Sequence, residues 1–407
     1  MGYEGKLATF FRDTVRIPQI LDGFHDIRKH PRIRLRDILT SVFLMPVLGL
    51  TALLRLDAVL RTPVMLRLFR CPKDKKVVVS DTTITRVLRW LKPEQSRQAL
   101  LAPCAMLEEK KLLVRRLTPT SAPRRLGVFD GSQMGGHYLV AALLCGAVNY
   151  PVLAEPCKGR GHELKTTQHW LPILQKQLGR CAPQLWLLDP HYFNQSSFKT
   201  VRDLKAHLLI MYTPEKNNEQ KTDNKLFRDV LEDARRLFAA ESAAVEPIEH
   251  SHGFDSERCC HWSMKKTSAD FALYPLNIFF LVEDYPKKKS GSHIESWIVT
   301  TDLSLDFAEA REAAHLRWQI ENNEFKRLSH LAGTKTRYFK DPAAFFAMLR
   351  LFCLALTAFA AFFHILSQAA DAAKALMQGC KFTWRSAFSQ LRWLEEDAFG
   401  YLVTAAG

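Results

Sequence analysis

Two aspartates directly follow short apolar runs that predict buried strands. Asp130 comes after Leu126-Gly127-Val128-Phe129, and Asp189 comes after Leu185-Trp186-Leu187-Leu188. A third acid, Glu321, lies in a predicted helix that follows another strand. Ligands collect at strand ends of open α/β sheets, and carboxylates there suit Mg²⁺, which takes oxygen ligands and leaves positions open for a substrate phosphate. Acids after strands are also common turn and cap residues, so the pattern leaves a structural role open.

The block around Glu321 resembles a known family. The stretch Arg317-Trp318-Gln319-Ile320-Glu321-Asn322-Asn323-Glu324-Phe325-Lys326 is similar to the glutamate helix of DDE transposases from bacterial insertion sequences, in which an RW-x-IE-N-x-x-F block carries the third catalytic acid. Phe129-Asp130-Gly131-Ser132 resembles the family's first-aspartate strand. Trp186-Leu187-Leu188-Asp189 with Tyr192 resembles its second-aspartate block, and Gly161-His162-Glu163-Leu164 matches a G-x-E-L segment often found between the two.

The resemblance covers most of the chain, with the three acids in the family's order at spacings of 59 and 132 residues. It implies an RNase H-like catalytic core, dependence on Mg²⁺ with Mn²⁺ as a substitute, and cut-and-paste movement of an insertion sequence through its terminal inverted repeats. By position, Asp130, Asp189 and Glu321 would be catalytic metal ligands. Arg317 lies one helical turn before Glu321 and would contact phosphate or orient the glutamate; a plain ion pair between the two is the alternative.

Two positions depart from the family's pattern. Many relatives have a Tyr three residues before the Arg and a Lys seven after the Glu, where this sequence has Ala314 and Leu328. Lys326 and Arg327 would supply positive charge from neighbouring positions, whereas His315 is one residue away from the place of the Tyr. The alternative function is therefore a catalytically inactive or repurposed DNA-binding regulator derived from a transposase. A repair or RNA-directed nuclease on the same core is a third candidate.

Other residues are candidates for DNA contacts. Trp297, on the strand before the glutamate helix, would stack on an extruded base, an interaction worth roughly 1–3 kcal/mol, or lie in the core as most tryptophans do. Lys287, Lys288 and Lys289 occupy a predicted hairpin tip that would grip the DNA backbone or be a solvated turn. Glu163 is a weaker candidate for a fourth acid.

Positive charge is concentrated in the first third of the chain. Residues 1–125 hold 25 of the 57 Lys and Arg but only 11 of the 42 Asp and Glu. Because such residues displace counterions from phosphates, the asymmetry favours double-stranded DNA as the partner, with a solvated basic surface as the alternative. Pairing two element ends implies a DNA-bound homodimer. The nine cysteines form no CxxC pair and no signal peptide is recognised, so we expect a cytoplasmic, nucleoid-associated bacterial protein with no membrane partner.

The predicted fold class is α/β, with an RNase H-like mixed sheet flanked by helices, an inserted subdomain before the glutamate helix and an all-helical N-terminal domain. The predicted units are a basic helical DNA-binding domain (1–122), the catalytic core (123–212 and 296–340), a partly β insertion subdomain (213–295) and C-terminal helices (341–407).

Predicted elements follow from apolar periodicity and turn residues. The expected strands cover 126–129, 138–148, 151–154, 185–188, 208–212, 277–282 and 296–300. Helices are expected at 166–178, at 196–205, from Ser80-Asp81 onward, and after Asp306, whose capping box would include Glu309. The apolar stretches 38–54 and 351–363 fall short of the ~20 residues of a membrane span and predict buried helices.

Overall fold

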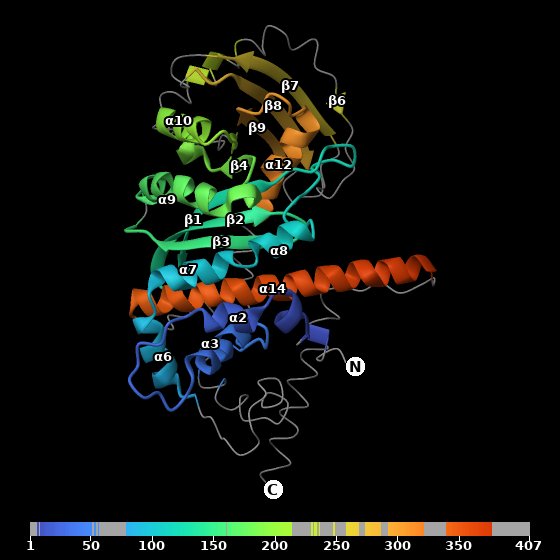
Figure 1. Cartoon of the computed structure of the whole chain (residues 1–407). Coiled ribbons are helices and arrows are strands. Elements are labelled where there is room, and N and C mark those ends of the chain that lie inside the picture. Colours follow the sequence, from blue (N-terminus) through green and yellow to red (C-terminus); the bar gives the residue numbers. More distant parts are fainter. Residues whose placement is uncertain are drawn as a thin grey trace.

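A computed structural model of the chain describes residues 6–7, 9–50, 53, 56, 79–159, 161–213, 229–230, 232–233, 236, 247–248, 258–267, 273–285, 292–320 and 339–376. These residues form a mixed sheet flanked by helices, as the predicted α/β class requires (Figure 1). The division into four units stays a prediction.

The described strands belong to one nine-stranded sheet with the order β3-β2-β1-β4-β5-β9-β8-β7-β6. Its first three strands form an antiparallel meander, β1, β4 and β5 are parallel, and the remaining strands continue antiparallel from β5. The strands are β1 (Leu126–Met134), β2 (His137–Cys145), β3 (Asn149–Pro156), β4 (Leu185–Leu188), β5 (His207–Tyr212), β6 (Pro247–Ile248), β7 (Arg258–Lys266), β8 (Leu276–Tyr285) and β9 (Ser292–Thr300).

The first strand is longer than the sequence predicted. The strand predicted at 126–129 ends too early, because β1 continues through Asp130, which pairs with Ala141 of β2. The chain instead reverses at Gly135 and Gly136, whose φ angles of 56° and 80° are readily adopted by glycine. The first aspartate therefore lies inside a strand.

The segment between β5 and β9 adds strands to the same sheet. The strands predicted at 277–282 and 296–300 lie within the longer strands β8 and β9, which form an antiparallel hairpin. β9 also pairs with β5, so the edge that β5 would otherwise expose is covered. The strands of the predicted insertion thus extend the sheet that carries the aspartates.

Three helices pack against the strands near the predicted acids. α9 (Glu163–Leu178) packs against β1 and β2, α10 (Gln195–Asp203) against β5, and α12 (Phe307–Ile320) against β4, β5 and β9. The capping box predicted for α12 is confirmed: the Glu309 amide donates to Asp306 Oδ1 at 2.8 Å, and the Asp306 amide donates to Glu309 Oε2 at 3.3 Å.

The described residues of the N-terminal part include several helices. The helix expected after Ser80 begins there, with the Thr83 amide donating to Ser80 Oγ at 3.3 Å. The predicted helix over 38–54 is shorter than expected and ends at Leu44, since Pro46 cannot continue it. The elements are η1 (Phe10–Thr14), α2 (Ile17–Asp22), α3 (Leu35–Leu44), α6 (Asp81–Trp90), α7 (Pro93–Leu101) and α8 (Cys104–Glu109).

One long C-terminal helix packs against both the N-terminal helices and the sheet. α14 (Pro342–Leu376) is 35 residues long and crosses the molecule between α3 and α6 on one side and α7 and β3 on the other (Figure 1). Its part Pro342–Leu366 is long and apolar enough to cross a membrane, but the apolar window is 100% buried within the protein. This burial agrees with the predicted core helix.

Candidate active site

The pairing of β1 with β4 brings the two predicted aspartates to neighbouring strands. The register joins Leu126 to Leu185 and Val128 to Leu187, an offset of 59 residues. Asp130 and Asp189 are separated by the same 59 residues, so they lie at matching positions just beyond the paired segment. Adjacent strands are about 4.8 Å apart, and the two aspartates therefore lie side by side where β4 ends.

Local hydrogen bonds orient both aspartates. Asp130 Oδ1 accepts a hydrogen bond from the Gly131 amide at 2.8 Å. Asp189 is the N-cap of the short helix η3 (Pro190–Tyr192), and its Oδ1 accepts from the His191 amide at 2.9 Å. Both carboxylates are only half-buried, so part of each remains accessible to solvent and ligands.

A further acid from α9 lies against the same strand. Glu163 is the first residue of α9, and a Cβ added to Gly131 would overlap its carboxyl group. Glycine at 131 therefore permits the close approach of Glu163 to the strand position next to Asp130. The G-x-E-L segment had marked Glu163 in the sequence only as a weaker candidate, because its proximity depends on how α9 packs on β1.

The negative charges of these three acids act on the hydroxyl of Tyr192. Tyr192 is 3% exposed and its hydroxyl is 2.8 Å from Thr167 Oγ1. Burial raises the pKa of Tyr192 most, and the negative charges of Asp130, Glu163 and Asp189 raise it further. The charges of three carboxylates thus favour the neutral form of this buried phenol.

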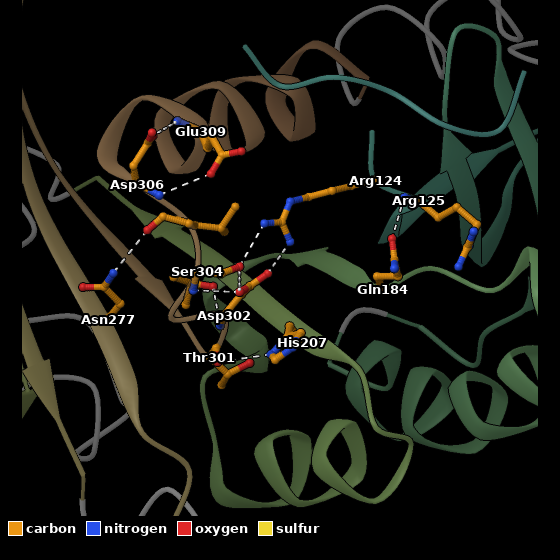
Figure 2. A network of polar contacts seen from close by, with 12 residues as sticks. Arg124, Arg125, Gln184, His207, Asn277, Thr301, Asp302, Ser304, Asp306 and Glu309 are labelled. Atoms are coloured by element: carbon orange, nitrogen blue, oxygen red, sulfur yellow. Dashed lines mark hydrogen bonds and ion pairs between the residues drawn. The ribbon is translucent and has the colours of Figure 1, made fainter. Parts of the chain in front are cut away.

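The start of α12 is tied to the edge where the parallel strands begin (Figure 2). Arg124, just before β1, bonds to Asp302 Oδ2 at 2.7 Å and to Ser304 Oγ at 2.9 Å. His207 Nδ1, at the start of β5, lies 3.1 Å from the carbonyl oxygen of Thr301. These contacts fix the loop before α12 to the starting edge of the sheet.

The length of α12 is similar to the distance that β1 spans from its start to Asp130. Ten residues from Phe307 to Arg317 advance about 15 Å along a helix. Four residues from Leu126 to Asp130 advance about 13 Å along a strand. Since the loop before α12 is held at the edge where β1 starts and the helix packs against β4 and β5, α12 is long enough to reach the level of Asp130 and Asp189.

Buried ion pairs hold α12 against β8. Arg311 Nε donates to Glu283 Oε1 at 2.7 Å, and His315 Nε2 lies 3.2 Å from the same oxygen. Burial alone would raise the pKa of Glu283, but the hydrogen bond from His315 and the positive charge of Arg311 lower it to about 2. His315, the residue beside the family's Tyr position, is therefore part of this anchor, and Ala314 is 1% exposed.

The predicted residues on the glutamate helix are only partly described. Arg317 lies half-buried in the last turn of α12. Glu321, Lys326 and Arg327 lie outside the described residues, as do Lys287, Lys288 and Lys289 between β8 and β9.

The DNA contact predicted for Trp297 is at odds with its position. Its side chain is 1% exposed and packs against Phe280 in a tilted arrangement, with ring centroids 4.4 Å apart. Trp297 is a core residue of the β8–β9 hairpin, which is the alternative that the sequence had left open. A base cannot reach it without repacking of this hairpin.

The donor set suits a hard divalent cation, although its third expected ligand is not described. Asp130 and Asp189 offer carboxylate oxygens side by side, the ligand type that Mg²⁺ prefers. Within the part of the chain that the structure describes, no three His, Cys, Asp or Glu side chains converge closely enough to hold a metal ion. The two aspartates alone do not form a metal site, and a site completed by Glu321 stays a prediction.

Comparisons with known proteins place the chain only distantly. No protein-family model and no curated protein matches it. Among solved structures it is similar to a piggyBac transposase synaptic complex with hairpin DNA, at 13% identity over 90% of this chain and 76% of that chain, with a TM-score of 0.38. A likeness at this TM-score assigns neither fold nor function, and membership of the bacterial insertion-sequence family stays a prediction.

Proposed function

We propose that this chain is a DDE transposase that cleaves DNA at the terminal inverted repeats of an insertion sequence and joins the freed ends to target DNA. The observation that carries the proposal is the matched register of Asp130 and Asp189 on adjacent parallel strands. The strand order β3-β2-β1-β4-β5 and the return of α12 toward these aspartates support an RNase H-like core.

Asp130, Asp189 and Glu321 would hold the Mg²⁺ ions. When bound, these ions activate the attacking oxygen and stabilise the leaving oxygen at a phosphodiester. Arg317, in the last turn of α12, orients the scissile phosphate or Glu321 by its charge. The basic N-terminal helices hold the inverted repeat, and two chains act together as a homodimer because two ends must be joined.

Two nucleophiles act in succession. Water loses a proton and attacks the phosphodiester at the element end, so that one P–O bond forms, the bond to the 3′ oxygen breaks and that oxygen takes up a proton as the 3′-OH. The freed 3′-OH then attacks a phosphodiester of the target in the same manner. The half-buried aspartates leave room for a phosphate to approach, and the protein forms no covalent bond to DNA.

Cleavage of labelled duplexes tests the proposal. The duplexes carry the inverted repeats that flank the coding region, and the protein is incubated with and without Mg²⁺ or Mn²⁺. Asp130→Asn, Asp189→Asn and Glu321→Gln should each lower the cleavage rate by roughly a thousandfold, because metal stabilisation of the transition state is worth several kcal/mol. Their affinity for the repeats should not fall.

Asp203→Asn is the matched control, because Asp203 is an exposed carboxylate on α10 with a side chain 56% exposed. It should cleave like the wild type. Undiminished cleavage by any of the three active-site variants would remove that residue from the mechanism. Specific binding of the repeats without cleavage in either metal would identify the chain as a DNA-binding regulator instead.

A further inference from the structure

A groove of about 440 Å³ lies between α6 and the loop that precedes α3. The loop side contributes Ile27, Arg28, Lys29 and Pro31. The helix side contributes Thr83, Arg86, Val87 and Trp90. On α6 these positions are three or four residues apart, so they form one continuous face of the helix.

Positive charge faces the groove from both walls. Lys29 and Arg86 are exposed, and no carboxylate among the described residues pairs with either. Asp26, next to the loop wall in sequence, is engaged by Arg28 at 2.7 Å. The groove therefore presents two available cations that attract an anionic ligand.

Apolar side chains flank these cations. Trp90 is 44% exposed and Ile27 is 52% exposed, and both line the groove. They are two of the five large apolar side chains that the described part of the chain leaves exposed. A partner that offers both negative charge and flat apolar faces fits this combination better than a simple anion, and a DNA strand offers both in its phosphates and its sugars and bases.

The groove is already shaped for a ligand. Arg28 donates to both carboxylate oxygens of Asp26, at 2.8 and 2.7 Å, and to the carbonyl oxygen of Ile33 at 2.8 Å, which holds the loop wall. The other wall, α6, is tied to the start of α14 by the Arg89–Asp341 ion pair at 3.0 Å. Because both walls are held in place, little conformational entropy is lost on binding.

We propose that this groove binds the sugar–phosphate backbone of the element's terminal DNA, with Lys29 and Arg86 on phosphates and Trp90 against a sugar or base. The proposal rests on the transposase function above and names the surface by which the N-terminal helices hold DNA. The excess of basic residues in the first third of the chain favours a polyanion over a protein partner at this surface.

The test is to measure the affinity of the full-length protein for a labelled inverted-repeat duplex by fluorescence anisotropy at a series of salt concentrations. The double variant Lys29→Ala/Arg86→Ala should weaken binding at 0.1 M salt by roughly tenfold or more. The slope of log K against log salt should fall by about 2, since two phosphate contacts are lost. Trp90→Ala should weaken binding by about tenfold and leave the slope unchanged.

Lys110→Ala is the matched control, because Lys110 is an exposed lysine at the end of α8 outside the groove. It should change neither affinity nor slope, and thermal unfolding should show that every variant is folded. If the double variant binds DNA with the affinity and salt slope of the wild type, the groove does not bind DNA. The transposase proposal would not be affected by that result. A change in self-association rather than DNA affinity would also overturn the groove proposal, in favour of a second copy.

Asp130→Asn separates the two proposals. If the groove and the transposase proposal both hold, this variant binds DNA like the wild type but does not cleave it, whereas the groove variants lose binding. Failure of the wild-type chain to bind any DNA would overturn both.

Discussion

At the scale of single residues, Gly131 shows how one missing side chain shapes the candidate site. The residue lies in a strand rather than in the turn that its type predicts. Glu163 occupies the space above it. Any larger side chain at 131 must displace the Glu163 carboxylate, so the local structure links these two residues beside Asp130.

Gly131→Ala should lower the free energy of unfolding by only about 1 kcal/mol or less, because the group that must move is the flexible end of the Glu163 side chain. Combining it with Glu163→Ala should recover most of that loss, since the overlapping group is gone. Urea unfolding of the two single variants and the double variant measures this coupling. Ser132→Ala, the neighbour on the same strand, is the control. If Gly131→Ala lowers the free energy of unfolding equally with and without the Glu163 side chain, Glu163 does not pack against Gly131.

At the scale of elements, α12 depends on contacts at two places along its length. Its start is bound through Asp302 to Arg124, at the beginning of β1. Its middle is bound through Arg311 and His315 to Glu283 of β8. The strand that the insertion adds to the sheet thereby positions the helix that leads to Glu321.

Glu283 makes the anchor of α12 sensitive to acid. Its pKa is lowered to about 2 in the folded chain, below the ordinary value of about 4.3. Its contribution to stability is therefore present above pH ~4.3 and is lost as pH falls through the folded value. The shift corresponds to on the order of 3 kcal/mol.

Glu283→Gln should lower the free energy of unfolding at pH 7 by about 3 kcal/mol, because the buried Arg311 would lose the charged carboxylate to which it is hydrogen-bonded. The variant should also lose part of the fall in stability between pH 4.3 and 2. Denaturant unfolding at several pH values measures both effects. Glu312→Gln, on the same helix, serves as control. A variant as stable as the wild type at pH 7 would mean that this pair does not hold α12.

At the scale of the whole molecule, α14 connects parts that are far apart in the sequence. Its Arg350 is 3% exposed and bonds to Glu155 of β3 at 2.8 Å and to Ser96 of α7 at 3.0 Å. Arg97 of α7 bonds to the same glutamate at 2.6 Å. The N-terminal helices, the sheet and the C-terminal helix therefore share one buried polar cluster.

Arg350→Met should lower the free energy of unfolding by roughly 3 kcal/mol, as expected when a buried ion pair loses one partner. Unfolding should remain a single transition, because α14 packs on both halves. Coincidence of far-UV and near-UV circular dichroism curves tests this. Arg97→Met should cost less, since Arg97 is 23% exposed. Separate melting of the N-terminal helices would contradict a shared core.

Local patterns in the sequence predicted most of the elements correctly. The run 185–188 is β4, Ser80 caps α6, and Asp306 with Glu309 caps α12. Such features depend on neighbours within a few residues, so the sequence carries them directly. The predicted end of β1 was wrong, because pairing with β2 decides how far that strand extends and local turn residues do not.

The sequence by itself determined the residue types of the candidate site, the order of its acids and the concentration of positive charge in the first third. Only the tertiary structure decided which of these residues meet. Strand register placed Asp130 beside Asp189, the packing of α9 brought Glu163 to Gly131, and burial put Trp297 in the core. These outcomes depend on contacts between distant segments, which hydrophobic periodicity and local propensity do not encode.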